Sequence, residues 1–523
     1  MYTMKIGKTF GILSAGMAAL SSCGGGKKVE HSHPYNIVFI MSDDHTRQMM
    51  SCYDKRHIET PNLDRIADGG VIFTNAFVAN SISGPSRACL LTGKHSHKNG
   101  KLDNRTAFDG SQQTVQELLQ KSGYQTAMIG KWHLDGEPRH FDHWEILPGQ
   151  GDYYNPVFIT PDGRKQYDGY VTDIVTDLSL DWLEKERDKD KPFCLFIHHK
   201  AIHRNWMSDT THLDAYEDKT FEFPSNFFDD YEGRPAAAQQ EMSIYKDMDI
   251  VYDLKMMCDS VHTRLSKTYR DNVYGRMNEA QRAAWDRHYQ PIIDAFYASK
   301  PEGKELAEWK FRRYMCDYAK VVKSLDENVG EVLDYLEKNG MMENTVVFYT
   351  SDQGFYMGEH GWFDKRFMYE ESFSTPLVVH LPSSLKKRGS IDALVQNIDF
   401  APTMLSLAGC EIPEDIQGVS LLPLLEKEET PRDWRKSLYY HYYEYPGEHA
   451  VKRHYGVRTE RYKLIHFYHD IDCWELYDLQ TDPNEMHNLY GKDGYEKITK
   501  ELKSESKRLQ QKYDDPILEQ YPL

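Results

Sequence analysis

Short apolar runs separated by amphipathic stretches are the main pattern along this chain. Five runs indicate buried strands, at residues 36–41 (NIVFIM), 126–130 (TAMIG), 193–198 (FCLFIH), 345–350 (TVVFYT) and 377–380 (LVVH). Continuous apolar segments of this kind are typical of strands whose two faces are both covered. Between them, apolar residues recur at helical spacing over 114–121, 171–186 and 314–337. Strands that alternate with helices predict an α/β fold, with a large mixed, mostly parallel sheet flanked by helices.

Two regions depart from this alternation. Residues 206–300 are polar, rich in Asp, Tyr and Met, and lack clear strand patterns. We expect a partly helical insertion there, on the ligand-binding face of a catalytic domain that spans 35–434. From residue 435 onward, 458–466 and 474–479 each have the pattern of an antiparallel strand. This predicts a smaller C-terminal α+β subdomain at 435–523.

The N-terminal segment has the features of a targeting signal. A short basic region precedes an apolar stretch at 10–20, which is too short to span a membrane stably. The four residues that end at Cys23 (LSSC) resemble the bacterial lipobox, in which the cysteine is lipidated after cleavage before it. This predicts a lipoprotein signal peptide at 1–22, a tether at 23–34, and an exported protein anchored by lipid in the periplasm or at the cell surface. An ordinary cleaved signal peptide with a coincidental cysteine is the alternative.

Composition and charge narrow the function classes. Hydrophobic residues make up 40% of the 523 and charged residues 28%, which is a globular composition and excludes a disordered or fibrous chain. The formal net charge is −18, so bulk electrostatics do not favour binding to nucleic acid. An anionic substrate would need a local basic pocket or a metal ion. The eight cysteines form no CxxC pair, so we expect one or two disulfides at most.

Polar side chains directly follow the predicted strands. In chain order they are Asp43 and Asp44, Lys131 and His133, His203, and Asp352 and Gln353. Because ligands bind at the carboxyl ends of strands in open α/β sheets, we expect these side chains to meet at one edge. Three carboxylates in one small site would repel one another, and a hard cation such as Ca²⁺ or Mg²⁺ would neutralise them. Taken separately, each acidic pair is equally consistent with a turn or a helix cap.

The segment 83–93, SGPSRACLLTG, carries the strongest single signal. Pro85 suits the first turn of a helix and Gly93 suits its end, so Ser83 would lie at the helix N-terminus, where backbone N–H groups favour an anion. A lone Ser-x-Pro-x-Arg would indicate no more than a helix cap. Here eleven consecutive positions fit one known motif.

That motif resembles the signature of type I formylglycine-dependent sulfatases, a family of the alkaline phosphatase superfamily, [Cys/Ser]-x-Pro-Ser-Arg-x-x-x-Leu-Thr-Gly. The resemblance extends over nearly the whole mature chain. It includes 36–44 (NIVFIMSDD), 130–133 (GKWH), 200–203 (KAIH), 351–354 (SDQG), 358–361 (GEHG), 399–403 (DFAPT) and 475–488 (ELYDLQTDPNEMHN). An alkaline-phosphatase-like fold is therefore implied.

The resemblance also implies residue roles. The first motif residue, Ser83, would be converted to formylglycine by a serine-type, anaerobic maturating enzyme, and its hydrate would attack sulfur. Asp43, Asp44, Asp352 and Gln353 would hold one Ca²⁺, with position 83 as a further ligand. Arg87 and Lys131 would stabilise the formylglycine and the sulfate, and His133 would contact the formylglycine hydroxyl. His203 and Lys365 would bind the sulfate ester, with His203 a candidate acid for the leaving oxygen.

The segments 141–144 (FDHW) and 147–156 (LPGQGDYYNP) are similar to bacterial glycosaminoglycan sulfatases, especially those like N-acetylglucosamine-6-sulfatase. This favours a sulfated saccharide as substrate, with the 6-O-sulfate of glucosamine residues in heparin or heparan sulfate as the leading prediction. The alternatives are a sulfatase for another sulfated glycan or an aryl sulfate, a phosphonate monoester hydrolase or phosphodiesterase, and a non-catalytic glycan-binding lipoprotein.

Overall fold

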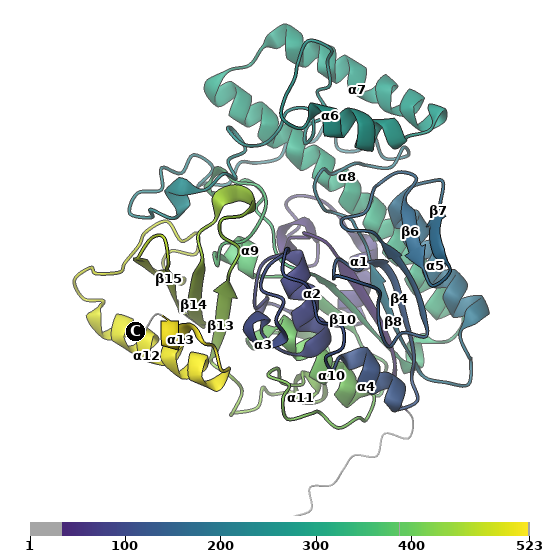
Figure 1. The fold of residues 1–523 in the computed structure, drawn as a ribbon, viewed down its shortest axis with the longest axis vertical. Coiled ribbons are helices and arrows are strands. Elements are labelled where there is room, and N and C mark those ends of the chain that lie inside the picture. Colours follow the sequence, from purple (N-terminus) through teal and green to yellow (C-terminus); the bar gives the residue numbers. More distant parts are fainter. Residues whose placement is uncertain (1–33, 386, 521–523) are drawn as a thin grey trace, which may run out of the picture. The chain divides into compact units, whose positions relative to one another are not determined.

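The strand predicted at 36–41 forms the middle of a ten-stranded sheet. A computed structural model of the protein describes residues 34–385 and 387–520. In it, β1 (Asn36–Ser42) lies between β8 (Phe193–His198) and β9 (Thr345–Ser351) and runs parallel to both. The order of strands is β11-β2-β10-β9-β1-β8-β4-β5-β6-β7 (Figure 1). The other strands are β2 (Gly70–Phe73), β4 (Gln125–Lys131), β5 (His143–Leu147), β6 (Val157–Thr160), β7 (Gly163–Gln166), β10 (Leu377–His380) and β11 (Gly389–Ile391).

The sheet is mixed and mostly parallel, as predicted. Strand β10 is antiparallel to β9 and β2, and β6 is antiparallel to β5 and β7, while the remaining strands share the direction of β1. All five strands expected from the apolar runs are present. The strands that the apolar runs did not predict are the short ones toward the two edges of the sheet, β2, β5, β6, β7 and β11. Strand β7 is also exposed throughout, so its hydrophobic signal is weak.

Helices cover both faces of this sheet, which explains why its central strands are continuously apolar. Val38 and Ile40 of β1 face a core shared with α1 (Pro61–Asp68), α5 (Val171–Asp181) and α8 (Gly303–Lys338). Phe39 and its β1 neighbours on the same side face α2 (Ser83–Thr92), α4 (Val115–Lys121) and α10 (Phe400–Leu407). Helix α8 begins well before the predicted position 314, because Phe311 in its first part packs against Phe223 and Phe227 rather than against the sheet.

Residues 206–300 consist of turns, short helical segments, α6 (Ser266–Thr268) and the longer α7 (Glu279–Ser299), as expected for a partly helical region without strands. In Figure 1, α6 and α7 lie together beside the N-terminal part of α8. Asn278 caps α7: its side chain accepts from the backbone N–H of Gln281, whose side chain accepts from the N–H of Asn278, both at 2.9 Å.

The C-terminal region contains an antiparallel sheet of β13 (Ser437–Tyr442), β14 (His454–Thr459), β15 (Tyr462–Phe467) and β16 (Cys473–Asp478). Helix α12 (Glu496–Lys512) packs on one face of it. The prediction of one strand over 458–466 is wrong, because the chain reverses at Glu460 and Arg461 between β14 and β15. That turn contains no Gly, Pro or Asn, so the strand pattern runs across it unbroken. The domain boundary at 434/435 stays a prediction.

The smaller elements complete the chain. Strands β3 (Ala76–Phe77) and β12 (Val395–Gln396) pair separately, and the short helices are α3 (Ser96–Asn99), α9 (Glu370–Phe373), α11 (Leu422–Glu426) and α13 (Ile517–Gln520). The seven cysteines of the described residues are all unpaired. Within 34–385 and 387–520, no helix has the length and apolarity needed to cross a membrane. The predicted signal peptide (1–22), Cys23 and all but the last residue of the predicted tether lie outside the described residues.

Gly130 in β4 allows the close approach of β8 that places the next residue, Lys131, at the sheet edge. Its φ is +103°, and a Cβ there would lie 2.0 Å from the backbone oxygen of His198.

Gly163 has a similar φ of +116° but nothing within 4 Å of its Cβ position. Gly163→Ala should therefore cost only backbone strain, about 1–3 kcal/mol. Gly130→Ala should cost clearly more, because strand pairing is also disrupted. Thermal unfolding of both variants tests this, and equal losses would contradict the close-approach argument.

Candidate active site

The predicted site residues leave the main sheet at the same edge. Ser42, at the end of β1, is paired with Ser351 at the end of β9, so Asp43-Asp44 and Asp352-Gln353 emerge side by side. On the other side of β1, Gly130 of β4 is paired with His198 of β8, which brings Lys131 and the turn 199–203 to the same place. The expectation that four strands deliver their polar residues to one edge is therefore met by the register of the sheet.

The carboxylates of Asp43, Asp44 and Asp352 are almost completely buried at this edge. The backbone N–H of Asp44 donates to Asp352 Oδ1 at 3.2 Å. Burial, together with the charges of Asp43 and Asp352 and against that of Lys365, raises the pKa of Asp44 to about 7. Burial and the charge of Asp43 also raise the pKa of Asp352. Burial would raise the pKa of Asp43 too, but Lys131, His203 and Arg87 hold it well below its usual range.

Each buried carboxylate has a basic partner that is itself buried. Lys131 Nζ pairs with Asp43, and Lys365 Nζ lies 2.7 Å from both carboxylate oxygens of Asp44. Arg87 Nη2 donates to Asp352 Oδ2 at 3.0 Å and lies 3.8 Å from Asp43 Oδ2. Burial lowers the pKa of Lys131 despite the neighbouring Asp43. The site thus contains three acidic and three basic side chains in contact.

Ser83 is the first residue of α2, as predicted from Pro85 and Gly93. The helix ends at Gly93, which has a φ of +67°. Ser83 is 1% exposed, and its Oγ donates to Asp43 Oδ1 at 3.2 Å. Gln353 Nε2 lies 3.4 Å from the same Oγ and donates to Asp44 Oδ1 at 2.5 Å. The signature serine therefore contacts Asp43, which follows β1, and Gln353, which follows β9.

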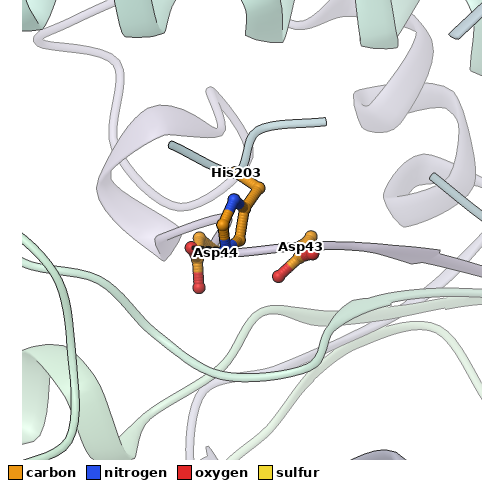
Figure 2. A group of neighbouring side chains, drawn as sticks. All are labelled: Asp43, Asp44 and His203. Carbon is orange, nitrogen blue, oxygen red and sulfur yellow. Dashed lines mark ion pairs between the residues drawn. The ribbon is translucent and has the colours of Figure 1, made fainter. Parts of the chain in front are cut away.

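The two predicted site histidines have different surroundings. His203 points toward Asp44 (Figure 2), with its Nε2 3.9 Å from Asp44 Oδ2 and its Nδ1 2.7 Å from the carbonyl oxygen of Arg204. The carbonyl can only accept, so Nδ1 carries the hydrogen. Burial and the nearby Lys131 lower the pKa of His203 well below its ordinary value, and they have the same effect on His133. The Nδ1 of His133 is buried and has no hydrogen-bond partner among the described residues.

The donor set fits a hard divalent cation. Asp43, Asp44 and His203 offer ligand atoms within 4.8 Å of one another (Figure 2). Within the described residues, the Oε1 atom of Gln353 is buried without a hydrogen-bond partner, which leaves an amide oxygen free for coordination. Carboxylate and amide oxygens are the ligands that Ca²⁺ prefers, whereas imidazole nitrogen suits zinc and other transition metals. A divalent ion would offset the burial and the neighbouring negative charges that raise the pKa of Asp44.

A cavity of about 370 Å³ opens over Ser83. Its other lining residues include His203 and Lys365, which were predicted, and Asn104, Arg105, Gln150, Arg204, Arg264, Asp364, Arg366, Glu444, Glu448 and His449, which were not assigned roles. Gln150 accepts from Lys131 Nζ and lies in the segment 147–156, singled out for a different reason. The remaining residues come from loops distant in sequence, and no spacing rule identifies them.

Comparison with known proteins gives consistent matches. A family model described as Sulfatase matches residues 35–410, and one described as N-sulphoglucosamine sulphohydrolase, C-terminal, matches 358–512. An N-acetylglucosamine-6-O-sulfatase of Bacteroides thetaiotaomicron is 51% identical over 96% of this chain and 91% of its own length. The solved structure of BT4656 in complex with its substrate D-glucosamine-2-N,6-O-disulfate has a TM-score of 0.89 and 52% identity, covering 92% of this chain and 98% of that one. A phosphonate monoester hydrolase from Silicibacter pomeroyi shares the fold, with a TM-score of 0.68, 18% identity, and coverage of 92% of this chain and 96% of its own.

Calcium should stabilise the protein through the carboxylates. At a free concentration 100 times Kd, added Ca²⁺ should raise the free energy of unfolding of chelator-treated protein by about 2.7 kcal/mol. Asp352→Asn should lose most of this gain, because the site loses a charged oxygen ligand. His203→Ala, the matched control beside the same carboxylates, should keep it. Thermal unfolding with and without Ca²⁺ measures both, and an equal calcium effect in wild type and Asp352→Asn would contradict the assignment.

Proposed function

This chain belongs to the sulfatase family and is a sulfuric ester hydrolase, and from that premise we propose that it removes the 6-O-sulfate of N-acetylglucosamine or glucosamine residues in heparin or heparan sulfate saccharides. The observation that carries the proposal is the 51% identity to an N-acetylglucosamine-6-O-sulfatase across 96% of this chain. The close structural match to a protein bound to a 6-O-sulfated glucosamine supports it.

The proposed metal ligands are Asp43, Asp44, Ser83, Asp352 and Gln353, which would hold one Ca²⁺. The neighbouring carboxylates of Asp43 and Asp44 and the free amide oxygen of Gln353 support this assignment. A formylglycine formed from Ser83 supplies a hydrated aldehyde as the nucleophile, and a bound Ca²⁺ supplies positive charge beside it. The hydrogen bond from Ser83 Oγ to Asp43 Oδ1 supports a role for Asp43 in accepting a proton from the group at position 83.

Arg87, Lys131 and Lys365 are proposed to surround the sulfate. Their side chains pair with the three acidic residues, so they are fixed in position before a substrate arrives. Fixed positive charge in a buried site stabilises charge that develops on the sulfuryl oxygens without reorganisation. His133 is proposed to contact the group at position 83, since its unpaired Nδ1 has a hydrogen-bonding capacity that the described residues leave unused.

His203 is proposed to donate a proton to the leaving oxygen. Its low pKa makes the imidazole neutral at neutral pH, with the hydrogen on Nδ1 and a lone pair on Nε2. An anionic sulfate ester bound beside Nε2 would favour the protonated ring. The residue would then carry the proton that the departing sugar hydroxyl needs.

The cavity over Ser83 suits a sugar ring. Its volume of about 370 Å³ lies within the range of small-molecule sites. Asp364 accepts from Arg366 Nε at 3.0 Å, and Glu444 accepts from Arg366 Nη1 at 2.9 Å. These charged groups hold one another in fixed orientations on the cavity wall, where they can bind sugar hydroxyls.

Export and anchoring are part of the proposal. The basic region, the apolar stretch and Cys23 support a lipoprotein signal peptide over 1–22 and an anchor on the cysteine. The protein would then act in the periplasm or at the cell surface on saccharides from outside the cell.

The proposed linkage is tested by free sulfate release. Enzyme produced together with a serine-type maturating enzyme should release sulfate from N-acetylglucosamine 6-O-sulfate in preference to 2-O-, 3-O- and 4-O-sulfated sugars. An aryl sulfate and a phosphonate monoester complete the panel. Preference for another sugar would replace the proposed substrate. Faster turnover of the phosphonate monoester than of any sulfate ester would favour a phosphonate monoester hydrolase.

Maturation at position 83 should control activity. Protein made without the maturating enzyme should lose at least about a thousandfold in kcat, because a plain serine lacks the second hydroxyl that regenerates the aldehyde. Peptide mass spectrometry should show the loss of hydrogen from Ser83 only in protein produced together with the maturating enzyme. Ser83→Ala, which has no hydroxyl to oxidise, should be inactive with or without that enzyme. Full turnover by unmodified protein would contradict this mechanism.

Cys23 should determine membrane attachment. In a native-type bacterial host, the wild-type protein should partition with membranes, and Cys23→Ala should appear in the soluble exported fraction, because the thioether site for the lipid is lost. Fractionation and lipid labelling measure this. Membrane attachment of Cys23→Ala would reject the lipid anchor.

A further inference from the structure

Two arginines lie exposed on the wall of the cavity that contains Ser83, and they come from segments far apart in sequence. Arg105 follows α3, and Arg264 belongs to the 206–300 region. Within 34–385 and 387–520, neither guanidinium has a hydrogen-bond or ion-pair partner. Arg204 on the same wall differs, because Asp253 accepts from its Nε and Nη2 at 2.6 and 2.8 Å. Arg105 and Arg264 are thus the unpaired arginines of this wall.

The same two arginines also line a second, larger cavity. Its volume is about 950 Å³, and the residues that it shares with the cavity over Ser83 are Arg105, Arg204, Arg264, Leu265, Glu448 and His449. The two cavities therefore adjoin, and both arginines line each of them. The combined space exceeds what one sugar ring requires.

The charge around this junction is locally positive although the chain is acidic overall. The formal net charge of the protein is −18, which repels polyanions at long range. At the junction, the exposed charged side chains shared by both cavities are Arg105, Arg264 and the carboxylate of Glu448. Asp364, which lines only the cavity over Ser83, is paired with Arg366 at 3.0 Å and with His449 at 3.2 Å. These shared exposed side chains comprise two guanidinium groups and one carboxylate, so their formal charges sum to a positive value.

We propose that Arg105 and Arg264 form a second anion-binding subsite, which takes a sulfate or carboxylate group of the substrate other than the sulfate that is cleaved. The inference rests on the proposed saccharide function and extends it to multiply anionic saccharides. Guanidinium groups bind sulfate and carboxylate oxygens through paired N–H donors, and their planar shape suits both groups. The second anion has two chemical sources: an N-sulfate on the same glucosamine, or the carboxylate of a hexuronate in the adjoining larger cavity.

Binding to a chain that cannot turn over tests this subsite separately from catalysis. In the full-length Ser83→Ala background, titration calorimetry measures Kd for three ligands: N-acetylglucosamine 6-O-sulfate, glucosamine 2-N,6-O-disulfate, and a hexuronate-containing disaccharide of 6-O-sulfated N-acetylglucosamine. Arg105→Ala and Arg264→Ala should raise Kd about tenfold more for at least one doubly anionic ligand than for the singly sulfated sugar. The ligand that responds identifies the source of the second anion. Arg105→Lys should recover part of the loss, because it keeps the charge but not the paired donors.

Arg287 provides the matched control, since it is an exposed arginine of α7 that lines neither cavity. Arg287→Ala should not change the ratio of the dissociation constants. The inference is overturned if Arg105→Ala and Arg264→Ala raise Kd equally for all three ligands, if Arg287→Ala has the same effect, or if neither doubly anionic ligand binds. Failure of the matured enzyme to release sulfate from 6-O-sulfated glucosamine would instead refute the proposed function. The binding measurement does not depend on turnover, so it would still test the subsite.

Discussion

Three carboxylates buried at the carboxyl ends of β1 and β9 impose the constraint on which the rest of the site depends. Buried charges must be paired, and here Asp43, Asp44 and Asp352 are paired with Lys131, Lys365 and Arg87. Removing one partner from such a pair typically costs about 3–5 kcal/mol, because the other charge is left buried. Three acids and three bases balance, so a divalent cation would leave the site with net positive charge. That balance suits a sulfate monoester, which brings one negative charge.

The fold brings these groups to one edge because polar side chains can leave the central strands only at the strand ends. Both faces of β1 are covered by apolar cores, so its side chains are apolar until the strand ends. The parallel register with β8 and β9 then places the following residues of all three strands at one edge. Helix α2, which packs on one face of the sheet, adds Ser83 and Arg87 to this edge. One turn of helix separates the two residues, so their side chains lie on the same side of α2. Gly130 allows β4 to pair closely with β8 and so positions Lys131.

Sequence patterns were sufficient for the sheet centre and for the acidic and basic residues of the site. The apolar runs are long there, and Asp43, Asp44, Lys131 and Asp352 follow such runs directly. Ser83, Arg87 and Lys365 do not, and they were predicted from the resemblance to the sulfatase signature and its family landmarks. They were insufficient where the signal is local and weak. The reversal at Glu460 and Arg461 lacks turn residues, and the beginning of α8 packs on the 206–300 region instead of the sheet. Arg105 and Arg264 could not be identified either, because their significance depends on cavities formed by segments distant in sequence.

The central claim is that the carboxylates hold a divalent cation and that the paired bases form a sulfate site beside it. Anomalous diffraction from crystals of the matured enzyme, grown with Ca²⁺ and soaked with a 6-O-sulfated glucosamine, tests it most directly. We predict one calcium peak about 2.3–2.6 Å from oxygens of Asp43, Asp44, Asp352 and Gln353. A sulfur peak should lie within hydrogen-bond reach of Lys131, Lys365 and His203. A map with no calcium peak, in which the sulfate binds away from Lys131, Lys365 and His203, would contradict the account.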